Sequence, residues 1–175
     1  MHSPIPGAPR QVPSPADIDA GLTAELAPVV AGARRRALRD GDRQVDTAHL
    51  LHSLMESDPD VRAAFESGPQ VARVLGYLVQ RSIGYGLRWQ GSVEDSGAVP
   101  LIGQPGWSPG VLSAMECARR RAFARGAARA TGLDLLAALA EDPRCRAVEV
   151  LGHAGVDAAA LACRLTEPSR QARRA

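Results

Sequence analysis

The sequence contains no lysine, and all 21 of its basic residues are arginine. The 19 acidic residues nearly balance them and leave a formal net charge of +2 at pH 7. Such a chain lacks the general positive field that draws proteins onto nucleic acid or anionic lipid. The phosphate-binding motif GxxxxGK[ST] requires a lysine, so ATP hydrolysis through that motif is excluded.

Cysteines, aromatic residues and long apolar runs are also scarce. Cys117, Cys145 and Cys163 are odd in number and form no CxxC pair, which predicts neither a disulfide framework nor a zinc knuckle. We interpret this as a reduced, cytoplasmic setting. No run approaches the roughly 18 apolar residues of a membrane span. The first residues lack the apolar segment of a signal peptide, so we expect neither a secreted nor a membrane-spanning protein.

The 175 residues, 45% of them hydrophobic, suffice for one domain with a core of alanine, leucine and valine. Apolar residues recur every three or four positions, the helical period, and no stretch alternates as a strand would. We therefore predict an all-α domain over residues 17–166. A proline-rich tail at 1–16 and a basic tail at 167–175 are expected to be disordered.

The helical material repeats with a shift of 85 residues, since ARRRAL at 33–38 returns as ARRRAF at 118–123. The same shift places the leucines at 50, 51 and 54 on those at 135, 136 and 139. DPDVRAA at 58–64 returns as DPRCRAV at 142–148 with one residue fewer. This indicates a duplicated four-helix repeat. Repeat one covers 22–83, a linker 84–106 and repeat two 107–166.

The prediction is a pseudo-two-fold bundle of about eight helices. The expected helices cover residues 23–39, 46–56, 59–66, 69–82, 108–125, 132–141, 144–153 and 157–165. Their starts carry capping residues and their ends carry glycines: Thr23, Ser108, and Asp46 or Thr47 as caps, and Gly41, Gly126 and Gly155 as stops. Pro28 conflicts with a start at 23, so the first helix must start late or kink.

Two tandem units of this kind resemble the Clp N-terminal domain, the double repeat at the front of Clp-type AAA+ unfoldases. The resemblance is carried by LTAELAPVVAGARRRAL with DTAHLLHSL, and by WSPGVLSAMECARRRAF with TGLDLLAAL. The ending RAVEVLGHAGVDAAAL is similar to the close of that domain. The resemblance covers residues 22–165. It implies a free-standing, non-catalytic module, without the ATPase and without a cofactor, that binds a peptide segment, an adaptor or a partner protein in Clp-linked proteostasis.

The resemblance also implies a binding site. In members that recognise phosphoarginine, a glutamate between Thr and His of each T-E-H-L-L motif holds the guanidinium. Those positions are Ala48 and Leu133 here, so we expect this recognition to be lost. The caps and the apolar residues before them are retained, which predicts an apolar site between the repeats. Its expected lining is Leu22, Thr23, Ala48, Trp107, Ser108 and Leu133.

Two other functions stay open. A protein that resembles an unfoldase N-domain could be a decoy that sequesters cyclic-peptide antibiotics directed at such domains, and the arginine- and alanine-rich composition is typical of a high-GC actinobacterium. The triplets Arg34–Arg36 and Arg119–Arg121 suggest a nucleic-acid binder. Consecutive helix residues point about 100° apart, however, so three adjacent arginines cannot line one face. Nucleic-acid binding ranks last.

We weigh two chemical alternatives against structural roles. GWSPG at 106–110 matches the GxSxG nucleophile motif, with Asp134 and His153 following in hydrolase order. Because no strand precedes it and Pro109 follows Ser108, we interpret Ser108 as a helix cap and predict no enzyme. His49 and His52 are three residues apart, but no third ligand is evident nearby, so we predict no metal site.

The two tryptophans flank the linker, and the three cysteines fall at apolar helical positions. For Trp107, packing and a place in a binding groove are equally supported, whereas Trp89 is expected to pack. The cysteines are expected to be small core residues.

Overall fold

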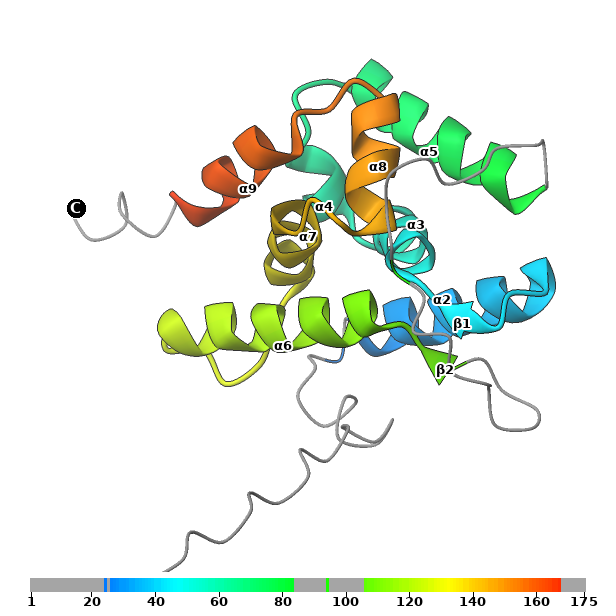
Figure 1. Ribbon diagram of the computed structural model, residues 1–175. Helices are drawn as coiled ribbons and strands as arrows, with labels where there is room; N and C mark the ends of the chain where they lie inside the picture. The colour runs from blue at the N-terminus through cyan, green and yellow to red at the C-terminus, as the bar shows by residue number, and fades with distance from the viewer. Residues whose placement is uncertain (1–23, 25, 84–93, 95–105, 168–175) are drawn as a thin grey trace, which may run out of the picture.

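A computed structural model describes residue 24, residues 26–83, residue 94 and residues 106–167 (Figure 1). These residues form eight helices and two short strands. The helices of repeat one are α2 (Leu26–Asp40), α3 (Thr47–Ser57), α4 (Pro59–Ala63) and α5 (Gly68–Ser82). Those of repeat two are α6 (Pro109–Ala124), α7 (Gly132–Glu141), α8 (Arg146–His153) and α9 (Ala158–Thr166). The predicted all-α, duplicated architecture is confirmed.

Capping residues explain where most helices begin and end. Asp46 caps α3, Ser108 caps α6 and Thr131 caps α7, each by accepting a backbone N–H of the first turn. Gly41, Gly126 and Gly155 follow helices with φ of 75°, 80° and 76°, a left-handed conformation that favours glycine, so the three predicted stops are confirmed.

The first helix starts late. Helix α2 begins at Leu26, so the predicted start at residue 23 was three residues too early. Pro28 then lies in the first turn, where backbone N–H groups have no acceptor within the helix. Of the two alternatives that Pro28 left open, the structure shows the late start.

Helices α3 and α7 form the centre of the bundle (Figure 1). Helix α2 packs against α3, and α6 packs against α7 in the same way, while α5, α8 and α9 lie on the other side of the central pair. The repeats also cross, because α8 contacts α3 and α4 contacts α7. This exchange of equivalent contacts is what an approximate two-fold axis between the repeats requires.

The core follows the predicted register. The leucines at 50, 51 and 54 in α3 and at 135, 136 and 139 in α7 are all fully buried. Equivalent ion pairs accompany them, since Arg36 of α2 pairs with Glu56 of α3, and Arg121 of α6 pairs with Glu141 of α7. Each pair joins the first helix of its repeat to the second.

The arginine triplets do not line one face, as expected. Within 34–36, Arg34 lies over the Trp107 ring whereas Arg36 pairs with Glu56. Arg119 pairs with Glu116 on its own helix. Arg34, Arg36 and Arg119 therefore form no continuous basic surface.

Two strands of two residues each tie the repeats together. Strand β1 (Gln44–Val45) pairs in parallel with β2 (Gly106–Trp107), with Gln44 opposite Gly106 and Val45 opposite Trp107. This pairing holds the start of repeat two beside the segment that leads into α3.

The three cysteines differ in how far they are buried. Cys145 is buried as predicted, but Cys117 is half-buried and Cys163 is exposed, so the core assignment of Cys163 was wrong. Cys163 lies two residues after the buried Leu161 of α9, on a different part of the helix surface. Among the described helices, none is long and apolar enough to cross a membrane.

Candidate functional site

The starts of three helices converge on the buried carboxylate of Glu94. Glu94 Oε1 accepts hydrogen bonds from Ser108 Oγ and the Thr47 backbone N–H, both at 2.6 Å. Its Oε2 accepts from Thr47 Oγ1 at 2.6 Å and from the Arg146 backbone N–H at 2.8 Å. The N-termini of α3, α6 and α8 thus share one carboxylate, which is 4% exposed. Helix N-termini favour such an anion.

Helix α8 depends on this arrangement because its own cap residue makes no side-chain cap. Cys145 occupies the N-cap position without a side-chain hydrogen bond to the first turn. Instead Glu94 accepts from Arg146 N, and Thr47 Oγ1 accepts from Ala147 N at 2.9 Å. The helix start in repeat two is therefore capped by repeat one and the linker.

The structure places the predicted site residues as follows. Ser108 is fully buried, caps α6 by accepting from Val111 N at 3.2 Å, and donates its hydroxyl to Glu94. The anion at this helix start is thus a carboxylate of the chain itself. Leu22 and Thr23, and with them the expected meeting of the two helix starts, lie outside the described residues, as does Trp89.

Ala48 and Leu133 occupy equivalent positions, each the second residue of the second helix of its repeat. Ala48 is 7% exposed and Leu133 is 37% exposed. Ala48 follows β1, whose Val45 pairs with Trp107 in β2. Leu133 lies instead at the start of α7, next to Gly132, where an added Cβ would clash with Asp58, the N-cap of α4.

Trp107 is half-buried and packs against the core. The Arg34 guanidinium carbon lies 4.6 Å from the centroid of its ring, a cation–π contact between the two repeats. Packing is therefore one role of Trp107, while its remaining surface stays accessible.

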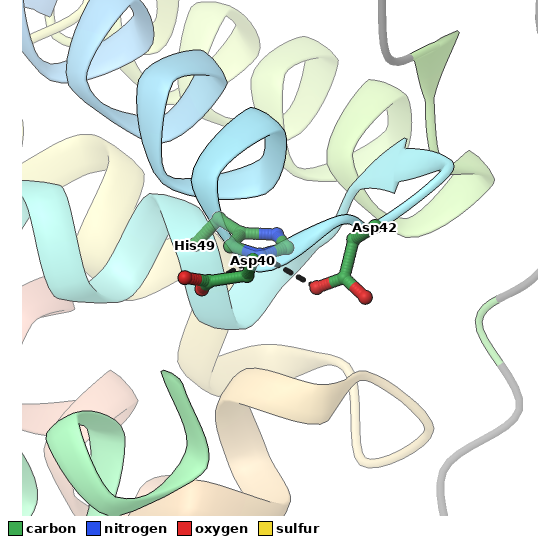
Figure 2. Close-up of side chains that lie close together, drawn as sticks. All are labelled: Asp40, Asp42 and His49. Atoms are coloured by element: carbon green, nitrogen blue, oxygen red, sulfur yellow. Dashed lines mark ion pairs between the residues drawn. The ribbon is translucent and has the colours of Figure 1, made fainter. Parts of the chain in front are cut away.

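A second polar cluster lies where α2 ends and α3 begins (Figure 2). Asp40 is the last residue of α2, Gly41 turns the chain, and Asp42 follows. His49, in the first turn of α3, places its Nε2 3.0 Å from Asp42 Oδ2 and 3.8 Å from Asp40 Oδ2. One carboxylate oxygen of Asp40, one of Asp42 and one ring nitrogen of His49 all lie within 4.8 Å of one another.

A buried carboxylate lies behind His49. Asp46 Oδ1 is 2.9 Å from His49 Nδ1, and Asp46 Oδ2 is 2.8 Å from Arg146 Nη1. Burial raises the pKa of Asp46, but hydrogen bonds and charges from His49 and Arg146 outweigh it and lower the pKa to about 2. Burial lowers the pKa of His49, but Asp42 and Asp46 outweigh it and raise the pKa to about 9.

The cluster borders a cavity of about 130 Å³. His52 lines the same cavity and is 3% exposed. Burial and the charge of Arg36 lower the pKa of His52 to about 4, so its imidazole is neutral at pH 7. The cavity lining comprises Asp40, Asp42, Asp46, Ala48, His49, His52, Leu78, Arg81 and Ser82.

A larger hollow runs along α6 and the connection between α7 and α8, with a volume of about 340 Å³. Small residues spaced three or four apart on α6 form one wall: Gly110, Ser113, Ala114 and Cys117. An adjoining hollow of about 320 Å³ extends to Pro109 and Glu94. We did not predict this surface from the sequence, although the spacing of small residues on α6 is a signal that could have indicated it.

The three residues in hydrolase order have separate partners. Ser108 donates to Glu94, and Asp134 accepts from Thr131 and pairs with Arg125. The His153 ring stacks on Tyr77 with 4.9 Å between centroids. The expectation that no strand precedes the motif was wrong, since β2 ends at Trp107, directly before Ser108. Ser108 nevertheless caps α6, and its hydroxyl donates to a carboxylate and not to a histidine, so the GxSxG motif lacks the nucleophile–base contact.

Comparison with protein-family models found no match, and neither did comparison with curated proteins. Solved structures do match. The N-terminal domain of ClpD, a caseinolytic protease-associated chaperone from Arabidopsis thaliana, has a TM-score of 0.61 at 18% identity, over 83% of this chain and 92% of that one.

Two further structures have similar scores. The N-terminal domain of the ClpV1 ATPase of the E. coli EAEC Sci1 T6SS gives 0.57 at 17% identity, over 86% of each chain. A structure described as part of a malarial protein secretion system gives 0.62 at 16% identity, over 86% of this chain and 96% of that one. The chain therefore has the fold of a Clp N-terminal domain, as the two repeats predicted.

Proposed function

We propose that this chain is a non-catalytic binding module of the Clp N-domain type, which recognises a peptide segment or a partner protein in Clp-linked proteostasis. The observation that carries the proposal is the structural likeness to the N-terminal domains of two Clp proteins over most of both chains. The ClpV1 domain belongs to an ATPase, whereas the 175 residues of this sequence contain no lysine and so no GxxxxGK[ST] motif.

Specific recognition of phosphoarginine is not part of the proposal. A guanidinium needs carboxylates for a bidentate pair, and Ala48 and Leu133 offer none. Glu94 adds a second reason, because its carboxylate already accepts the Ser108 hydroxyl that would meet a phosphate. A phosphate at this helix start would also be repelled by the carboxylate.

The proposed contact surface is the exposed part of Trp107 and the hollow beside the start of α6. Trp107 supplies a large apolar side chain. The hollow has a wall of small residues on α6, and its charged lining residues are Arg120, Arg144, Glu141 and Asp142. Binding sites combine such an apolar lining with a few placed polar groups. An extended peptide segment with apolar side chains suits this surface best, because Arg120 and Arg144 are balanced by Glu141 and Asp142 in the same lining.

The test uses the full chain and two labelled probes, an unfolded casein and a purified Clp unfoldase, followed by fluorescence anisotropy. We expect saturable binding of at least one of them, and Trp107→Ala should weaken it by about tenfold, as loss of an aromatic anchor does. Ser113→Trp should block the hollow, because Ser113 is exposed on α6. Arg119→Trp, a bulky change elsewhere on α6, is the control.

Absence of binding to both probes by the folded protein would contradict the proposal. Binding of a cyclic-peptide antibiotic in the absence of binding to either protein would favour the decoy function instead. Free phosphoarginine should show no heat of binding in calorimetry. Ala48→Glu combined with Leu133→Glu should restore affinity only in a variant that also carries Glu94→Gln, because the Glu94 carboxylate occupies the Ser108 hydroxyl.

A further inference from the structure

The cluster at the end of α2 carries chemistry that the proposed function does not use. We propose that Asp40, Asp42 and His49 bind a divalent transition-metal ion, with zinc as the best fit, and leave one coordination position open to the neighbouring cavity. The site would join the end of α2 to the first turn of α3.

The spacing of the ligand atoms suits one ion. Zinc binds imidazole nitrogen and carboxylate oxygen at about 2.0–2.2 Å, which puts two ligand atoms of a tetrahedral site about 3.3 Å apart. His49 Nε2 lies 3.0 Å from Asp42 Oδ2 and 3.8 Å from Asp40 Oδ2. Small rotations of the two aspartates would close this geometry, and Asp42 is free to make one because its side chain is 50% exposed.

His49 is already oriented as a metal ligand would be. Its Nε2 faces the two carboxylates (Figure 2). Its Nδ1 lies 2.9 Å from Asp46 Oδ1. Asp46 is itself fixed by burial and by Arg146 at 2.8 Å. In this structure Nδ1 accepts the Asp46 backbone N–H at 3.0 Å. Metal binding through Nε2 would place the proton on Nδ1, which would then donate to Asp46 Oδ1, the usual outer-shell partner of a zinc-bound histidine.

Repeat two shows that the fold does not require these three residues. The shift of 85 places Asp40 on Arg125, Asp42 on Ala127 and His49 on Asp134. The backbone is alike, since Gly126 repeats the left-handed turn of Gly41, and Ala127 N donates to Ala122 O at 2.9 Å as Asp42 N does to Ala37 O.

In repeat two, Arg125 and Asp134 close this junction as a simple ion pair. Repeat one instead has two carboxylates and an imidazole around one point. The pair Asp40–His49 is thus the pair Arg125–Asp134 with the charges exchanged. Asp42 has no counterpart in this exchange, because repeat two has Ala127 there, so the second carboxylate beside His49 is additional to what the fold needs.

The cavity provides a further observation. His52, 3% exposed, lines the cavity beside the cluster, and its Nε2 has no hydrogen-bond partner, although Glu56 Oε1 lies 3.3 Å away.

The ligand set of the proposed site, the His49 imidazole with two carboxylates, suits zinc or cobalt, whereas calcium and magnesium take oxygen ligands almost exclusively. The site should therefore discriminate between these two groups of ions.

The test is calorimetric titration of the chelator-treated full chain with Zn²⁺, next to Asp42→Ala and the control Asp60→Ala. Asp60 is an exposed aspartate of α4 outside the cluster. We expect a Zn²⁺ site that Asp42→Ala weakens by about tenfold or more, the scale on which loss of a metal-site partner acts, and that Asp60→Ala leaves unchanged. Excess Mg²⁺ should not compete.

A second readout does not depend on how well a variant folds. In the unmodified protein, Zn²⁺ should shift the His49 Nε2 resonance in ¹⁵N NMR, and Co²⁺ should give the visible absorption of a tetrahedral site. A His49 resonance unmoved by saturating Zn²⁺, or equal Zn²⁺ affinity in Asp42→Ala and Asp60→Ala, would overturn the proposal. Neither result would bear on peptide binding, so the proposed function is tested separately.

Discussion

Asp46 and Arg146, one hundred residues apart, form a buried ion pair between the two repeats, with 2.8 Å between Asp46 Oδ2 and Arg146 Nη1. Their side chains are 3% and 15% exposed. Asp46 also caps α3 by accepting from His49 N at 2.9 Å. One carboxylate thus fixes a helix start, orients His49 and holds repeat two against repeat one.

The first prediction concerns acid stability. The pKa of Asp46 is lowered from 3.8 to about 2, so the folded state favours its charged form. This contribution is fully present above pH 3.8 and is lost as the pH falls through 2. It amounts to about 2 kcal/mol. Urea unfolding at a series of pH values should show it as a difference between the wild type and Asp46→Asn that shrinks toward pH 2. A difference independent of pH would show that Asp46 acts through packing alone.

The second prediction concerns Glu94. Glu94→Gln places an amide group among four donors, so at least two buried donors lose their acceptor. Each unsatisfied buried donor costs about 1–3 kcal/mol, so we expect a loss of about 3 kcal/mol in the free energy of unfolding. Glu116→Gln is the matched control, because Glu116 is half-exposed and pairs with Arg119 at the surface. Equal melting temperatures for the two variants would refute the role of Glu94.

The third prediction compares two glycines that differ in backbone conformation. An added Cβ would meet nothing within 4 Å at either Gly126 or Gly76, but Gly126 has a φ of 80°. Gly126→Ala should therefore destabilise the protein by about 1 kcal/mol. Gly76→Ala, inside α5, should stabilise it by up to about 1 kcal/mol. Chemical denaturation measures both, and changes of the same sign would contradict the assignment of the turn.

The fourth prediction concerns thiol reactivity. Cys163 is exposed, whereas Cys145 is 3% exposed and burial raises its pKa to about 11. Because the thiolate is the reactive form, iodoacetamide should modify Cys163 first and Cys145 only on unfolding. Mass spectrometry of the digested protein gives the order. Modification of Cys145 at the rate of Cys163 would mean that α8 opens readily.

Much of the fold was predictable because its signals are local or periodic. The 85-residue shift of ARRRAL and of the leucine pairs predicted the two repeats, and the glycines at 41, 126 and 155 predicted three helix ends. The short β1–β2 pairing was not predicted, because two residues are too few to show alternation. The exposure of Cys163 was missed because alanine-rich α9 has apolar residues around most of its circumference.

The two polar clusters were less accessible to sequence reasoning. Glu94 is 47 residues from Thr47 and 52 from Arg146, so no local pattern relates it to the helix starts that it caps. His49 was compared with His52 on its own helix, where no third ligand follows. Its neighbours Asp40 and Asp42 come from across a turn, and Gly41 places them there.

The two repeats contain equivalent ion pairs, so the same interaction can be measured at two places in one chain. Arg36–Glu56 and Arg121–Glu141 have nearly the same side-chain exposure, 15% and 50% against 17% and 45%. A double-mutant cycle on each pair would measure one interaction twice within a single chain. Arg121 also donates to Thr166 Oγ1 at 3.2 Å. Glu56 Oε1 in turn lies 3.3 Å from His52 Nε2, where repeat two has Ala137. Repeating the two cycles in Thr166→Ala and in His52→Ala would report how a neighbouring hydroxyl and a neighbouring imidazole each alter the ion pair.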